Sequence, residues 1–258
     1  MLKQALIAFL ALAAAPAAFG QEAGKWSAGA GIAYTSGDYG TTQATNILAV
    51  PFTLRYERER WTFKGTLPWY SVSGSSAVVP ELGAADRGNR RGAGAASSST
   101  TGFGDATASA TYTAFYDARS RLGIDFTGKV KLPTGEESKG LSSGSTDFTL
   151  GGDLYKTIDR TTWFAGLSYT MFGSSSLQLQ NAVGYSVGGS YRLDDRDSIG
   201  ASLDGRTRVS AASAPQRELV GYWSHSFGRN WKVHTYGLVG LANGSPDFGL
   251  GASVLRAF

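Results

Sequence analysis

The chain of 258 residues has no cysteine, only 7 prolines and, beyond its first twenty residues, no long apolar run. Without cysteine it can form no disulfide, no Cys-ligated zinc site and no thiol nucleophile. A membrane-spanning helix needs about 20 consecutive apolar residues, so none is predicted after residue 20. The basic residues are scattered and form no recognition motif, so nucleic acid is not an expected partner.

The first twenty residues differ from the rest of the chain. Lys3 supplies a positive charge, residues 5–15 are apolar, and Ala18-Phe19-Gly20 has small residues where a signal peptidase reads the chain. We therefore predict a signal peptide over residues 1–20 and one mature domain over residues 21–258. A membrane anchor is the alternative, but the apolar stretch is too short to span a bilayer.

Alternation with a period of two residues recurs along the mature chain in about twelve runs of roughly ten residues. In one clear run, Leu122, Ile124 and Phe126 alternate with Asp125 and Thr127. The connections alternate between short and long, as in outer-membrane barrels. The pattern predicts an all-β fold, a transmembrane antiparallel up-and-down β-barrel of about 12 strands. The run over residues 219–227 is ambiguous in phase, and a soluble all-β exported protein is the alternative fold.

Aromatic residues mark the predicted strand ends. A girdle beside the short turns and the termini is typical of a membrane interface. A soluble sandwich would instead scatter its aromatic residues through the core. The predicted members of this girdle are Trp26, Tyr56, Trp61, Tyr155, Trp163, Tyr191, Phe227, Trp231 and Phe258.

Three short motifs and the last residue carry a resemblance. The motifs are Gly102-Phe103-Gly104-Asp105, Val130-Lys131-Leu132-Pro133-Thr134-Gly135 and Gly144-Ser145-Thr146-Asp147-Phe148. Their succession resembles a family of outer-membrane barrels linked to the meta-cleavage pathway of phenol degradation. The terminal Phe258 looks like the signal that the barrel-assembly machinery of Gram-negative bacteria reads. The resemblance implies transport of small molecules and a place in the outer membrane among its lipids and lipopolysaccharide, and it offers no assigned catalytic residues to transfer.

Charged residues fall on the predicted inward faces, mostly on the fourth, fifth and sixth strands. They could form a constriction that selects solutes, as charged rings do in pores. They could equally neutralise each other across neighbouring strands. No cofactor is expected, and no dense cluster predicts a metal site. The candidate lumen-lining residues are Asp105, Asp125, Lys129, Lys131, Asp147, Asp153, Asp204, Arg206, Arg208 and His234.

Two further features concern the lumen. The inward faces of the first and last strands are rich in glycine, which either leaves space for a solute or eases tight curvature. The longest connection, residues 71–101, could fold into the barrel as a plug or be disordered.

Passive passage of small solutes, including aromatic or other hydrophobic compounds, is the leading hypothesis for function. A non-conducting structural or surface-binding barrel is the second. A lipid-modifying enzyme is the third, and it would have to use His225 or His234. Ser224 and His225 are adjacent in a strand and point to opposite faces, so they cannot form a dyad without a bulge.

Overall fold

The computed structural model describes residues 24–85, 97–211 and 213–258. The expected signal peptide lies outside the described residues. Nearly all regular structure is β, with one short 3-10 helix, η1 (Glu137–Lys139).

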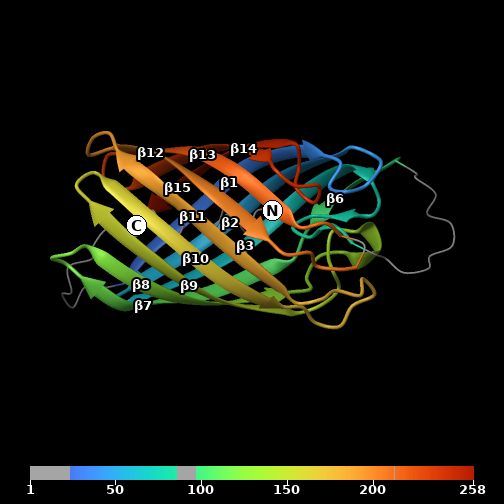
Figure 1. Ribbon diagram of the computed structural model, residues 1–258, viewed down its shortest axis with the longest axis horizontal. Coiled ribbons are helices and arrows are strands. Elements are labelled where there is room, and N and C mark those ends of the chain that lie inside the picture. The colour runs from blue at the N-terminus through green and yellow to red at the C-terminus, as the bar shows by residue number, and fades with distance from the viewer. Residues whose placement is uncertain (1–23, 86–96, 212) are drawn as a thin grey trace.

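Twelve segments of the barrel wall pair antiparallel with their neighbours along the chain, and the last pairs with the first, so the sheet closes (Figure 1). This confirms the predicted twelve-stranded antiparallel barrel. The wall strands are β1 (Lys25–Gly37), β2 (Thr45–Arg58), β3 (Trp61–Ser75), β7 (Ala106–Asp117), β8 (Leu122–Leu132), β9 (Asp147–Ile158), β10 (Thr161–Met171), β11 (Ala182–Arg192), β12 (Asp197–Arg206), β13 (Gln216–Phe227), β14 (Trp231–Gly240) and β15 (Phe248–Ala257).

The outer surface of the barrel is apolar. Large side chains that would form a core in a soluble protein are exposed here, among them Leu150 (61%), Leu167 (67%) and Leu250 (61%). No second sheet or helical layer covers them among the described residues. Such a surface is compatible with hydrocarbon, in which closing the sheet leaves no unpaired backbone edge. No helix in the described ranges is long and apolar enough to cross a membrane.

The two ends of the barrel differ. We call one end the short-turn end and the opposite end the long-loop end. The short-turn end carries the tight connections β2–β3, β7–β8, β9–β10, β11–β12 and β13–β14. Phe258 lies at the short-turn end, where its N–H donates to the Trp26 carbonyl. Most predicted girdle residues are exposed there, but Tyr155 departs from the prediction. It is buried and faces the lumen, because it lies two residues after Asp153 on β9 and therefore on the same face of the strand.

The fourth wall strand is interrupted. β6 (Ser97–Phe103) pairs with residues 69–75 of β3, whereas β7 pairs with residues 61–66 of β3. Further along β7, the pairing with β8 shifts register between Thr113 and Phe115. The extra residue reverses the alternation, so that Tyr116 points inward although Tyr112, four residues earlier, points outward.

The ambiguous phase of the run over residues 219–227 is resolved in β13. Val220 and Tyr222 are buried and face inward, whereas Leu219 and Trp223 are exposed on the outer face. Apolar residues occupy both faces of this strand, which explains why alternation alone did not fix its phase. The inward phase also places Glu218 in the barrel interior.

Part of the longest connection folds into the barrel. Strands β4 (Val78–Val79) and β5 (Gly83–Ala84) form a two-residue hairpin, and we refer to residues 77–85 as the lumen hairpin. Val78 and Val79 are 2% and 1% exposed. Val78 packs with Ile47, Tyr70 and other wall side chains in one apolar cluster. The alternative of a plug, left open by the sequence, therefore fits this segment.

We expect the replacement Leu167→Arg to lower the free energy of unfolding by about 2–4 kcal/mol, because a lipid-facing cation near the bilayer midplane is costly. Leu167 lies mid-strand in β10. Urea unfolding in lipid vesicles measures this loss. The matched control is Leu241→Arg, beyond the end of β14 and also exposed, for which we expect about 0–1 kcal/mol. Equal losses at the two sites would contradict the lipid-facing assignment.

Candidate functional site

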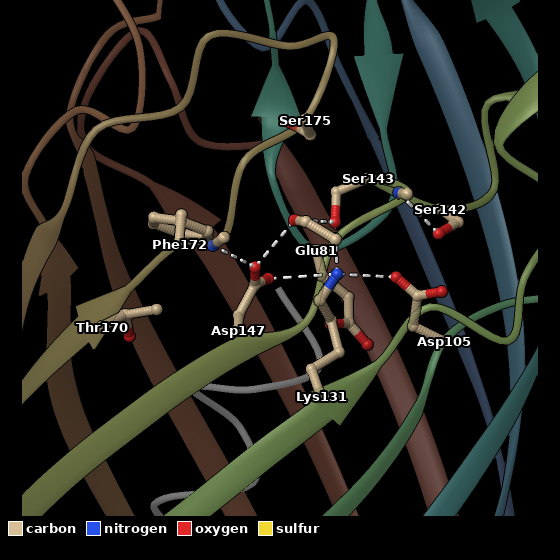
Figure 2. A network of polar contacts seen from close by, with 12 residues as sticks. Glu81, Asp105, Lys131, Ser142, Ser143, Asp147, Thr170, Phe172 and Ser175 are labelled. Atoms are coloured by element: carbon tan, nitrogen blue, oxygen red, sulfur yellow. Dashed lines mark hydrogen bonds and ion pairs between the residues drawn. The ribbon is translucent and has the colours of Figure 1, made fainter.

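The most developed polar cluster in the lumen is a buried ion-pair triad. Lys131 on β8 lies with its Nζ 2.7 Å from an Asp105 carboxylate oxygen and 3.0 Å from one of Asp147 (Figure 2). The three side chains are only 4%, 6% and 1% exposed. Lys131 also hydrogen-bonds Ser143, and Ser145 donates to Asp147 at 2.9 Å. The triad thus ties the loop before β9 to the barrel wall.

The triad also unites the three sequence motifs. Asp105 follows Gly104 at the interruption between β6 and β7, Lys131 belongs to the second motif, and Asp147 to the third. The Thr134 hydroxyl accepts a hydrogen bond from the Ala106 N–H at 2.8 Å and donates to the Gly104 carbonyl at 3.2 Å. The second motif therefore satisfies backbone groups that the broken strand leaves without a ladder partner.

This triad matches the neutralising interpretation of the inward charges. Two carboxylates flank one ammonium, so opposite charges are held in contact and no broad ring of one sign forms. Desolvating these groups is expensive, and their mutual attraction offsets the cost only while all three remain in place.

A second polar group lies in the lumen closer to the short-turn end, beside the first half of β8. Asp125 and Asp153 are directly opposite each other in the β8–β9 register. Like charges in that position repel. Lys64 and Lys129 line the same small cavity of about 60 Å³ as Asp153 and bring positive charge to this level. Asp125, Lys129 and Asp153 are among the candidate lumen-lining residues, whereas Lys64, also on the polar face of its strand, is not.

A third group supports the lumen hairpin. Arg206 on β12 donates to the carbonyl oxygens of Glu81 (3.1 Å) and Leu82 (2.8 Å). From the other side of the hairpin, the Tyr70 hydroxyl donates to the Glu81 carboxylate at 3.0 Å. Asp204 faces Glu218 in the β12–β13 register, and both side chains are buried. Arg206 and Tyr70 thus fix the hairpin between β12 and β3.

Of the remaining two candidate lumen-lining residues, Arg208 and His234, only His234 faces the lumen. Arg208 lies beyond the end of β12 and is exposed, so it does not line the strand wall as predicted; the strand ends two residues earlier, at Arg206. His234 does face the lumen and is buried, with its Nδ1 2.8 Å from Ser224 Oγ across the β13–β14 pair.

The two histidines lie on opposite faces of the wall. His225 points outward, where its Nδ1 lies 2.9 Å from Asp197, while His234 and Ser224 point inward. The serine–histidine contact and the histidine–carboxylate contact are therefore separated by the barrel wall. A nucleophile, its base and an orienting acid would have to converge on one face. Within the described ranges, no group of three or more potential metal-ligating side chains occurs either.

Glycine on the inward face makes room for aromatic rings. Tyr236 lies across Gly251, where an added Cβ would come within 2.3 Å of the ring. Tyr222 covers Gly200 in the same way. Part of the space that glycine leaves at the β1–β15 closure is thus occupied by Tyr236, and a cavity of about 70 Å³ remains there.

A much larger cavity, of about 570 Å³, opens at the short-turn end. We call it the vestibule. Its wall comes from the ends of β7 and β9 to β14 and from the turns between them, and includes Arg121, Arg160, Arg192, Arg196 and Lys232. Alternation does not identify the four arginines, because they sit in or beside turns, where no face is defined. The arginine that recurs in or beside several short turns is the sequence feature that could have indicated a cationic vestibule.

Comparison with known proteins supports the fold. No protein-family model matches the sequence, and no curated protein matches it, so the resemblance to the phenol-pathway barrels stays a prediction. Among solved structures, the KdgM porin is 11% identical, covering 88% of this chain and 99% of that chain, with a TM-score of 0.50. At this identity the likeness shows the fold alone.

Two other similar structures have lower TM-scores. The translocator domain of the autotransporter NalP from Neisseria meningitidis is 13% identical over 93% of this chain and 90% of that chain, with a TM-score of 0.49. The CymD monoaromatic hydrocarbon channel is 14% identical over 93% and 89%, with a TM-score of 0.43. The fold and the apolar exterior together define the class: a transmembrane antiparallel β-barrel.

We expect Lys131→Met to lower the free energy of unfolding by about 3–5 kcal/mol, because it leaves two buried carboxylates without their cation. Urea unfolding in lipid vesicles measures the change. The control Lys139→Met removes an exposed pair with Glu136, and we expect it to cost at most about 1 kcal/mol. Comparable losses for the two variants would show that the triad does not stabilise the barrel.

Proposed function

We propose that the protein is a passive channel for small solutes across the outer membrane. The observation that carries this proposal is the combination of a closed barrel with a polar, charged lumen, a vestibule of about 570 Å³ at one end and a separate hairpin at the other. A lipid-facing barrel with a purely structural role has no need of a vestibule or a hairpin inside its wall. Porins likewise combine an apolar exterior with a polar interior.

The proposed orientation places the short-turn end in the periplasm and the long-loop end outside the cell, as in outer-membrane barrels generally. Phe258 then lies on the periplasmic side, where the assembly machinery is expected to read it. Contact with lipopolysaccharide belongs to the same proposal, because the long-loop end would face the outer leaflet.

The lumen hairpin is the proposed obstruction of this channel. Its own strand pairing is only two residues long, and it is not part of the wall sheet. Arg206 and Tyr70 hold it through the three hydrogen bonds described above. Because the hairpin is not part of the wall ladder, its proposed movement would break no pairing between wall strands.

A non-conducting barrel is the second candidate, and one observation favours it. The lumen near the long-loop end is packed with apolar side chains, including Ala33, Tyr39, Ile47 and Val72, against Val78 of the hairpin. Were this packing permanent, solutes could not pass. The aromatic or hydrophobic nature of the solute, implied by the sequence resemblance, remains a separate prediction.

Planar-bilayer conductance and liposome swelling with a small sugar test the proposal. Replacing residues 77–85 by a short Gly-Ser linker should raise conductance severalfold over that of the wild-type chain, since it empties the lumen near the long-loop end. The control replaces the exposed residues 136–139 by Gly and Ser at equal length and should leave conductance unchanged. Absence of conductance in the folded linker variant would overturn the proposal in favour of the non-conducting barrel.

A further inference from the structure

Cationic side chains outnumber carboxylates in the vestibule wall by five to three. Arg192 and Lys232 lie at inward-facing strand positions, in line with Ser190 and His234, and Arg196 sits in the turn before β12. None of these three cations has a hydrogen bond or ion pair from its side chain among the described residues. Unpaired cations around a concave, partly enclosed space concentrate a positive field there.

Two further arginines have only part of their donor capacity in use. Arg121 Nη1 donates to the Asp159 carbonyl, and Arg160 Nη1 donates to the Leu193 carbonyl, each at 3.2 Å. Both acceptors are neutral backbone oxygens in the next turn around the rim. A guanidinium has five N–H donors, so each arginine keeps its full charge and further donors for a ligand.

The three carboxylates of the vestibule wall, Asp194, Asp195 and Asp197, offset only part of this charge, because five cationic side chains line the same wall. Asp197 accepts from the Trp223 indole at 2.8 Å and contacts His225 on the outer face. Asp194 accepts from the backbone N–H groups of Arg196 and Asp197, at 2.7 and 2.8 Å. These bonds hold the pKa of Asp194 below its ordinary value, which favours its charged form. With five cations against three carboxylates, the vestibule wall keeps an excess of positive charge.

We propose that the vestibule binds small organic anions, specifically carboxylates, and that it makes the channel selective for them. Arginine presents paired donors that match a carboxylate, and charge-assisted hydrogen bonds of this kind are the strong ones. The volume of about 570 Å³ lies within the range of small-molecule sites. The inward rings of Tyr116 and Tyr155 add aromatic surface to the same wall, so an aromatic carboxylate fits both kinds of contact. The selectivity rests on the proposed channel function, whereas the binding does not.

Equilibrium binding of benzoate to the full chain folded in detergent micelles tests the site directly. Benzyl alcohol, a neutral analogue of similar shape, is the second probe. We expect benzoate to bind more tightly than benzyl alcohol and to weaken as salt rises, because an open site is screened. The triple variant R192Q/R196Q/K232Q should bind benzoate on the order of tenfold more weakly, because charge-assisted hydrogen bonds to the carboxylate are lost.

The control variant R229Q removes one arginine from the same end of the barrel, at a turn residue outside the vestibule wall. It should leave benzoate binding unchanged. Equal benzoate binding by the triple variant and the wild-type chain, or equal binding of the two probes, would overturn the proposal.

Ion selectivity in a KCl gradient separates this proposal from the channel function. A conducting wild-type chain should favour chloride over potassium, and the triple variant should lose that preference while R229Q keeps it. If the lumen does not conduct at all, the channel function fails and benzoate binding still decides the vestibule. If it conducts without anion preference, the selectivity proposal fails and the channel stands.

Discussion

The structure depends on pairing every backbone N–H and C=O group within the protein, because lipid offers no hydrogen-bond partner. Lipid leaves no partner for an exposed sheet edge, so the pairing of β15 with β1 is the step that makes the wall stable in a membrane. The interruption between β6 and β7 shows how strictly this constraint applies. Where the ladder breaks, the Thr134 hydroxyl and the Asp105 carboxylate bond the backbone of the opposite segment. Side chains of the local sequence motifs thus replace the ladder hydrogen bonds that the interrupted strand lacks.

The same closure divides each strand into two chemical environments. Outward positions meet hydrocarbon and carry leucine, valine and aromatic residues, while inward positions can hold charge only if it is compensated. The triad of Asp105, Lys131 and Asp147 achieves compensation by direct contact. At the short-turn end the interior opens widely enough for water to screen the arginines, so close pairing is unnecessary there.

The strand number, the antiparallel order and the orientation of most side chains could be predicted from the sequence. Alternation of apolar and polar residues shows directly which face of a strand meets a polar environment. Asp125, Lys129 and Asp153 occupy alternating positions on the inward face of β8 and β9. Prediction failed where alternation stops: β12 ends before Arg208, and apolar residues on both faces of β13 concealed Glu218. The inserted hairpin and the vestibule depend on contacts between turns and strands that are distant in sequence, which periodicity does not encode.

Arg206 binds the lumen hairpin through the carbonyl oxygens of Glu81 and Leu82 rather than through their side chains. Main-chain oxygens are present whatever residue occupies those positions. The side chains at 81 and 82 can therefore diverge among related sequences without loss of this anchorage, provided that the backbone path and the guanidinium persist. Variation in the hairpin would then alter what the mouth of the barrel admits while its point of attachment stays constant.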